Sequence, residues 1–238
     1  MKILDELDSI PMDFIMSVGP ACRPAQQIKQ AGLRVTSSPL DWMQLYPLTA
    51  VTHCFSTGFT DFFEEIEDIS PDENRKNRRV VDVNNDICSI HHFPMNEPLE
   101  KAQKRVRRMM RKRFKRIDRL MCKAKAICLV ANRDEPTQVL LEFLEEFEEI
   151  YPDAYLYMVN IRHTSEPGFQ VSVVSGRRCT LYEAHFCDEH PDGTDITKNP
   201  DAWQGNTPYW MNTLRHLCLS DRTIRWANSP LQNFLHKI

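Results

Sequence analysis

The sequence lacks several features that would point to a common function. It has only seven glycines against fifteen prolines, which argues against a glycine-rich loop that cradles a phosphate group. No apolar run approaches the ~18 residues that a membrane-spanning helix needs. The opening residues are too acidic and too interrupted for a secretory signal. We therefore expect a cytoplasmic protein with no membrane partner.

The eight cysteines follow neither a disulfide nor a zinc pattern. Their spacing is dispersed and no Cys-x-x-Cys pair occurs, so disulfides and a structural zinc site are both disfavoured. The set closest to a metal site is Cys179, Cys187, His185 and His190. A strand followed by a polar loop explains that stretch more simply. We expect no metal and no cofactor.

The order of the apolar segments predicts an α/β protein. Residues 126–131 form a continuous apolar run, a helical pattern follows to Ile150, and a second strand pattern covers residues 154–161. This order is typical of parallel strands joined by a crossover helix. Residues 169–174 and 179–186 read as an antiparallel hairpin toward the C-terminus. We expect a central, mostly parallel sheet flanked by helices, in a single domain over residues 1–238.

Other elements are predicted from local signals. Short strands are expected at residues 80–83 and 87–90, a surface loop at 67–79, and a long loop at 187–208. Helices are expected at residues 100–120 and 209–219, with a turn at 231–235. Asp41 is a candidate cap for the apolar segment of residues 42–48, and Asp134 or Thr137 for the helix that ends at Ile150.

The segment around Cys22 is the best candidate for a reactive site. Residues 14–18 read as a buried strand, and residues 25–31 carry strong helix formers before Gly32. Cys22 therefore lies in a strand-to-helix turn, at or near the N-terminus of a helix. The helix dipole and the neighbouring Arg23 would both favour the thiolate there. The alternative is that Cys22 is a small buried apolar residue.

A cysteine nucleophile needs a base, and His91 and His92 are the candidates. Both follow the strand expected at residues 87–90, so they would emerge at a carboxyl edge, where active sites of open α/β sheets gather. Asp41 could be the third group that orients the base. The alternatives without a catalytic role are that His91 and His92 are a surface histidine pair and that Asp41 only caps a helix.

Three motifs resemble a known family. Residues 15–25 (Ile-Met-Ser-Val-Gly-Pro-Ala-Cys-Arg-Pro-Ala), residues 37–43 (Ser-Ser-Pro-Leu-Asp-Trp-Met) and residues 91–93 (His-His-Phe) are similar to the motifs of a bacterial family of papain-like cysteine peptidases, long classed as a domain of unknown function. The basic helix and the apolar strand after it match in order, so the resemblance covers about residues 13–160.

The resemblance implies catalytic roles for particular residues. By the match, Cys22 is the nucleophile and His91 the base of a hydrolase or acyl transferase acting on an unknown peptide, acyl or other small-molecule substrate. The family has Asp where this chain has His92, which favours Asp41 as the acid. Arg23, Trp42 and His92 are candidate substrate-binding residues. Trp42, His185 and Trp203 are candidates for a pocket wall, and the oligomeric state is left open.

Two alternative functions compete with the enzyme hypothesis. One face of the helix at residues 104–119 is intensely basic, which is attractive to phosphate or nucleic acid. The net charge of −3 and the lack of interleaved aromatic residues disfavour nucleic acid, and the Glu-rich helix near residues 135–150 could lie alongside and supply opposite charge. The other alternative is a sugar or nucleotide transferase whose loop at residues 188–203 closes over a polar substrate.

Overall fold

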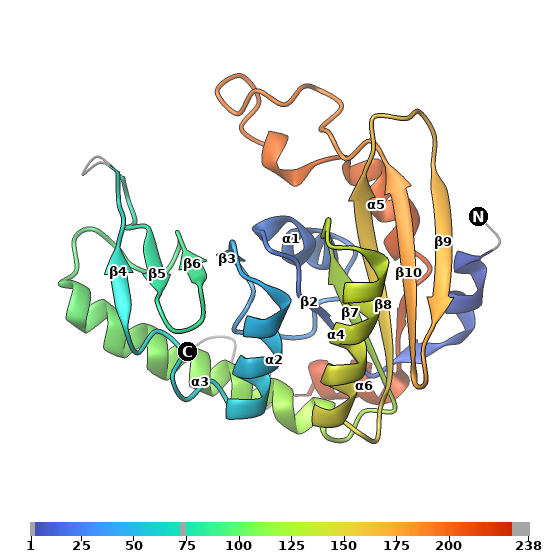
Figure 1. Cartoon of the computed structure of the whole chain (residues 1–238), viewed down its shortest axis with the longest axis horizontal. Helices are drawn as coiled ribbons and strands as arrows, with labels where there is room; N and C mark the ends of the chain where they lie inside the picture. The colour runs from blue at the N-terminus through green and yellow to red at the C-terminus, as the bar shows by residue number, and fades with distance from the viewer. Residues whose placement is uncertain (1–2, 72–74, 230–238) are drawn as a thin grey trace.

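The computed structural model describes residues 3–71 and 75–229, in which the strands form three β-sheets, and the two larger sheets lie side by side (Figure 1). The elements in chain order are η1 (Leu4–Ser9), β1 (Pro11–Met12), β2 (Phe14–Ser17), α1 (Cys22–Gln30), β3 (Met43–Gln44), α2 (Leu48–Thr57), β4 (Ile66–Asp68), β5 (Val80–Asp82), β6 (Ile87–Ser89), α3 (Leu99–Met121), β7 (Ala126–Ala131), α4 (Thr137–Ile150), β8 (Tyr155–His163), β9 (Gln170–Ser175), β10 (Cys179–Phe186), η2 (Ala202–Gln204), α5 (Thr207–Leu214), β11 (Cys218–Leu219) and α6 (Asp221–Ala227).

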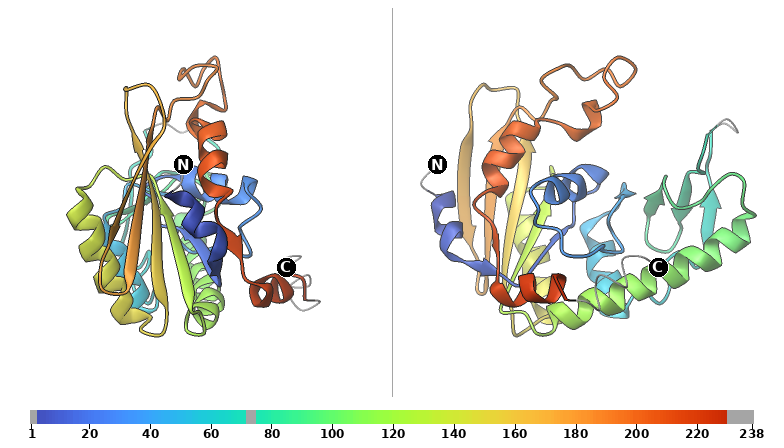
Figure 2. Two further views of the ribbon diagram at one scale, coloured as in Figure 1. Left: turned by 90° about the vertical axis from the view of Figure 1, so that its right-hand side faces the viewer. Right: turned by 180° about the vertical axis from the view of Figure 1, so that it is seen from behind.

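The larger sheet has five strands in the order β2-β7-β8-β10-β9. β2, β7, β8 and β10 are mutually parallel, and β9 is antiparallel to β10. Viewed edge-on, α4 covers one face of this sheet, and α1 and α5 lie over the other (Figure 2). The α/β class, the mostly parallel sheet and the C-terminal hairpin are therefore confirmed.

Burial explains why the sequence pattern of this sheet was easy to interpret. All six residues of β7 are buried, because helices cover both faces of the strand. α4 buries one stripe at helical spacing, made by Leu140, Phe143, Leu144 and Phe147. The apolar run of β7 and the apolar stripe of α4 thus have the same cause, which is that helices pack on both faces of the larger sheet.

The smaller sheet is antiparallel, with four strands in the order β3-β6-β5-β4. β6 therefore does not belong to the sheet that contains β2, and the expectation that His91 leaves a carboxyl edge of the same parallel sheet is wrong. β4 also falls at the start of the region predicted as a loop at residues 67–79. One hydrophobic cluster contains residues of both sheets, including Met43, Ile87 and Leu129.

Several predicted helix ends need correction. α2 begins only at Leu48, after the N-cap Pro47, so Asp41 caps no helix there. The N-cap of α4 is Pro136, not Asp134 or Thr137, and it makes no side-chain capping bond. The predicted helix at residues 209–219 is α5, which runs from Thr207 to Leu214.

The C-terminal region contains elements that the sequence pattern did not indicate. β11 pairs in parallel with β1, and the short helix α6 follows it. The turn predicted at residues 231–235 lies outside the described residues. Among the helices of the described residues, none combines the length and the apolar character needed to cross a lipid bilayer.

Candidate active site

Cys22 is the first residue of α1, directly after the turn that leaves β2. Its predecessor Ala21 is extended, with φ −148° and ψ 172°, and no side chain caps the helix. The first amide groups of a helix have no intrahelical acceptor, so they concentrate positive potential around the thiol. Gly19 is required in the turn, because a Cβ there would lie 2.6 Å from Pro24 Cγ and 2.8 Å from Asn132 Oδ1. The predicted strand-to-helix position of Cys22 is therefore observed.

Two side chains, one from the smaller sheet and one from the segment that follows its strand β6, meet the sulfur of Cys22. His91, two residues beyond the end of β6, places Nε2 3.5 Å from Cys22 Sγ. Gln44, the last residue of β3, donates its side-chain amide to Cys22 Sγ at 3.7 Å. β3 and β6 are paired in register, with Gln44 opposite Cys88, so one sheet holds both groups. The geometry joins a thiol, an imidazole and an amide donor.

The electrostatics of this pair favour the neutral thiol and the neutral imidazole. Burial raises the pKa of the Cys22 thiol, against the lowering effects of the Gln44 amide and of the N–H of Cys22 itself. Burial also lowers the pKa of His91. Both shifts oppose a preformed thiolate–imidazolium pair. Burial thus acts against our expectation that the resting sulfur is anionic, and Arg23 is paired with the Asp188 carboxylate.

Backbone contacts fix the two halves of this site against each other. The N–H of Leu45 donates to Pro20 O at 2.8 Å, which links the residue after Gln44 to the turn before Cys22. Arg133, only 1% exposed, donates from Nε to Val18 O at 2.8 Å and from its terminal nitrogen to Tyr46 O at 3.0 Å. One buried guanidinium thus bridges the segments that carry the thiol and the amide.

An aromatic pair lies against the imidazole of His91. The ring of Trp42 meets that of His91 edge-to-face, with centroids 6.0 Å apart, and the ring centroid of Trp203 lies 6.3 Å from that of Trp42. Trp42 has a left-handed backbone, with φ 69°, which is uncommon for a bulky residue. Such a strained conformation persists only where the surroundings impose it, and here it aims the indole at the imidazole.

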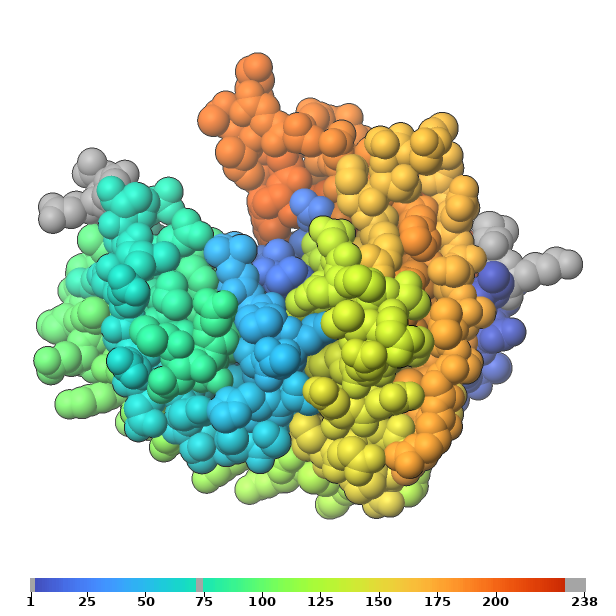
Figure 3. Space-filling view, in the orientation of Figure 1, coloured from blue at the N-terminus to red at the C-terminus, as the bar shows by residue number. Residues whose placement is uncertain are grey.

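The long loop between β10 and α5 is anchored on α1 beside Cys22. Arg23 forms an ion pair with the Asp188 carboxylate at 2.6 Å and donates to Trp203 O at 2.8 Å. Gly205, with φ 69°, completes the anchor, because a Cβ there would overlap the Asp188 carboxylate and come within 2.9 Å of Arg23 Nε. Figure 3 shows a hollow between this loop (orange) and the smaller sheet (teal), with α1 (blue) at its base.

The remaining predicted site residues have other partners. The Asp41 carboxylate is buried, pairs with Arg34 at 2.8 Å and accepts the N–H of Ser38 at 3.0 Å. Among the described residues, no hydrogen bond joins Asp41 to His91. His92 turns its Nδ1 to Ser89 Oγ at 2.9 Å, and burial, followed by the nearby Arg113, lowers its pKa to about 3.

The pocket-wall candidates are only partly brought together. Trp42 and Trp203 lie close to one another, as described above. His185 lies in β10, and β7 and β8 separate that strand from β2. The structure thus places His185 away from the strand that leads to Cys22.

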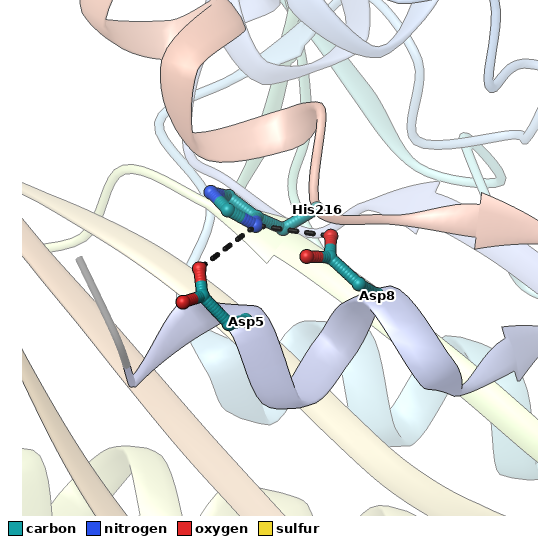
Figure 4. Close-up of side chains that lie close together, drawn as sticks. All are labelled: Asp5, Asp8 and His216. Carbon is teal, nitrogen blue, oxygen red and sulfur yellow. Dashed lines mark hydrogen bonds and ion pairs between the residues drawn. The ribbon is translucent and has the colours of Figure 1, made fainter.

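The four residues considered for a soft metal cannot share one ion. Cys179 begins β10 and Cys187 follows its end, so at ~3.3 Å per residue the two are about 26 Å apart along the strand. Among the described residues, the one group with ligand atoms close enough together is Asp5, Asp8 and His216 (Figure 4).

The Asp5–Asp8–His216 group has the hydrogen bonding of a structural contact. Arg215 Nε donates to His216 Nε2 at 3.5 Å, which assigns the ring proton to Nδ1. Nδ1 then donates to Asp8 Oδ1 at 3.0 Å. Both ring nitrogens are thus engaged, and the contact attaches η1 to the end of α5.

Sequence reasoning missed Gln44 and Arg133. Gln44 follows the Asp-Trp-Met stretch by one residue, and no local pattern distinguishes it from a surface glutamine. Arg133 did carry a signal, because it lies just beyond the buried strand β7, where polar residues gather at the carboxyl edge of a parallel sheet.

Comparisons with known proteins give one match. A family model described as "putative papain-like cysteine peptidase" matches residues 13–150, more than half of the chain. This range contains Cys22, Gln44, His91 and Arg133. Neither a search of curated proteins nor a search of solved structures found a match.

Proposed function

The chain belongs to the family described as "putative papain-like cysteine peptidase", and from this premise we propose that it is a cysteine-dependent hydrolase or acyl transferase. The observation that carries the proposal is the 3.5 Å approach of His91 Nε2 to Cys22 Sγ at the start of a helix. A nucleophile and a base at this separation are within the range seen before substrate binds.

The neutral resting pair determines how the reaction begins. His91 Nε2 accepts the proton from the Cys22 thiol as the sulfur attacks a carbonyl carbon. A carbon–sulfur bond forms, and the carbonyl electron pair moves onto oxygen. When the tetrahedral intermediate collapses, the leaving group departs with the proton held by His91, and a thioester remains on Cys22. Water or another acceptor, deprotonated by His91, then attacks the thioester carbon. The carbon–sulfur bond breaks, the acyl group leaves on the acceptor, and the proton held by His91 returns to the sulfur of Cys22.

Gln44 is suited to stabilise the oxyanion that forms during the attack. The attacked carbon bonds to sulfur, so its oxygen develops within reach of groups that surround Cys22 Sγ. The Gln44 amide lies 3.7 Å from that sulfur, and the N-terminal amides of α1 are adjacent. Such donors are among the largest contributors to acyl-transfer catalysis.

Trp42 and Asp41 are positioning residues in this proposal. Among the residues that the structure describes, the His91 ring bonds to Cys22 and to no carboxylate, and its edge-to-face neighbour is Trp42. Asp41 binds Arg34 and Ser38 and so holds the turn that carries Trp42. The base is thus oriented by an indole, and Asp41 acts through that indole.

The test is acyl transfer to Cys22 from an activated ester such as p-nitrophenyl acetate. We expect a burst of p-nitrophenol and an acyl adduct that peptide mapping locates at Cys22. His91→Ala should abolish the burst, and Gln44→Leu should slow it by roughly 100-fold, as expected for loss of one oxyanion donor. Gln44→Glu should be at least as slow, because a carboxylate repels the oxyanion.

Cys122→Ala is the matched control, because this thiol is exposed and bonds to Asp118. It should leave the burst unchanged. The proposal fails if the adduct forms equally on Cys122, or if His91→Ala acylates as fast as the unaltered protein.

A further inference from the structure

A basic groove runs along α3 next to α6. It has a volume of about 940 Å³, and its lining comes from these two helices together with Asp13, Ser37 and Lys123. Figure 2 shows α6 beside the C-terminal part of α3. The cationic residues of the lining are Arg105, Arg108, Lys112, Arg113, Lys115, Arg116, Arg119, Lys123 and Arg222, against the single carboxylate of Asp13.

The basic surface continues beyond this groove. A neighbouring hollow of about 390 Å³ is lined only by Lys and Arg of α3, and it shares Arg108, Lys112 and Lys115 with the groove. From Arg105 to Leu120 the groove follows 15 residues of α3, or about 23 Å at 1.5 Å per residue, and Lys123 extends it just beyond the end of the helix. An elongated, positively charged channel results.

Most of this charge has no acidic partner in the part of the chain that the structure describes. Ion pairs within 4.0 Å engage only Arg105, with Glu97, and Arg222, with Asp13, among the cations of the groove. The glutamates of α4, which we expected to lie alongside, pair instead with Arg177 and Arg178. Burial alone lowers the pKa of Arg116, so this guanidinium is already partly desolvated.

The tertiary structure adds an aromatic residue that the basic run itself lacks. Trp226, near the end of α6, lines the groove together with Met109 and Leu120 of α3. Trp226 is partly buried and packs against the hydrophobic cluster, so its ring is held in place. Basic grooves that contain a fixed aromatic platform are typical of proteins that bind single strands, because phosphates follow the cations and bases stack on the ring.

We propose that this groove binds single-stranded nucleic acid, with phosphates paired to the cations of α3 and a base stacked on Trp226. The groove is elongated, which suits an extended single strand that lies along α3. Its hollow shape disfavours duplex recognition by α3, because a helix that reads a duplex projects into the major groove. This proposal does not depend on the chemistry of Cys22.

Anisotropy titration of the full-length chain with a labelled oligodeoxythymidine of about 12 nucleotides tests the proposal. Contact with about four phosphates predicts that log K falls against log salt with a slope near −3, since each contact on a single strand contributes about −0.7. Duplex of the same length, inorganic polyphosphate, and vesicles with phosphatidylserine serve as competitors, and each should compete less well.

Two pairs of variants locate the site. Arg108→Glu with Lys112→Glu should weaken binding at least tenfold, while Lys29→Glu with Lys198→Glu makes the same change in net charge on exposed residues outside the groove and should have a much smaller effect. Trp226→Leu should weaken binding about fivefold or more, and Trp226→Phe should retain most of it, because a ring remains for stacking.

Circular dichroism identifies variants that fail to fold. If Trp226→Leu does not fold, the affinity of Trp226→Phe still tests the role of the ring. The proposal is overturned if the oligonucleotide does not bind at about 50 mM salt. Equal competition by polyphosphate, duplex or vesicles would also overturn it, as would equal weakening by the two pairs of charge variants.

Discussion

Replacing the buried Arg133 by Met tests whether one guanidinium holds the site together. Its Nε and terminal nitrogens donate to Val18 O at 2.8 Å and to Tyr46 O at 3.0 Å, and it pairs with Glu135 at 2.7 Å. Its guanidinium carbon also lies 5.3 Å from the centre of the Tyr46 ring. Met has a similar length and no donor, so Arg133→Met leaves both carbonyls without these partners.

The magnitude follows from those two carbonyls. Each buried acceptor that loses its partner costs about 1–3 kcal/mol. Removing a buried charge recovers part of this cost, because the guanidinium no longer has to be desolvated. We expect Arg133→Met to lower the free energy of unfolding by roughly 2–4 kcal/mol. For a protein of this size, the corresponding fall in Tm is about 5–15 °C.

Urea denaturation measures the loss of stability, and alkylation of Cys22 by iodoacetamide reports the local consequence. Val18 and Tyr46 flank the segments that carry Cys22 and Gln44, so alkylation should become faster under native conditions. Arg225→Met is the matched control, because Arg225 is exposed and should change stability by no more than about 0.5 kcal/mol.

The reasoning is refuted if Arg133→Met unfolds at the same urea concentration as the unaltered protein and Cys22 is alkylated at an unchanged rate. The carbonyls of Val18 and Tyr46 would then be satisfied without the guanidinium.

Three further predictions follow from the geometry of the site. The lowered pKa of His91 keeps the imidazole neutral down to a pH below its ordinary value of ~6.5, so the rate of acyl transfer should fall only below that pH. The raised pKa of the Cys22 thiol means that its alkylation in the free protein should become faster only above the ordinary thiol pKa. An acyl-transfer rate that already falls at pH 7 or higher would contradict this. Trp42→Ala should reduce kcat by about 10- to 100-fold by releasing the imidazole, and Trp42→Phe should retain more activity in the same ester assay. Gly205→Ala should destabilise the protein by about 2 kcal/mol or more in thermal melts, because its Cβ meets the buried aspartate, whereas Gly32→Ala adds a Cβ in open space at a similar φ and should cost less.

Much of the fold was predictable because its signals are local. The continuous apolar run of β7 and the apolar stripe of α4 record burial on both sides of the parallel sheet. The end of β2 and the helix formers after Pro24 placed Cys22 at the start of a helix. Each of these inferences needs only residues that are neighbours in the chain.

Other features were not predictable because distant segments determine them. Pro47 rather than Asp41 precedes α2, and the short strand β6 joins a second sheet, which no local propensity indicates. Arg23 was expected to favour the thiolate, but its ion pair is with Asp188, 165 positions away.

The sequence by itself determined where the thiol lies, because strand length, turn residues and helix propensity act between neighbours along the chain. The tertiary structure decided which groups surround it. Gln44 meets the sulfur only because β3 pairs with β6, and Trp226 enters the basic groove only because α6 packs beside α3. The protonation of the Cys22–His91 pair was also decided at this level, since burial depends on how the two sheets and α1 pack together.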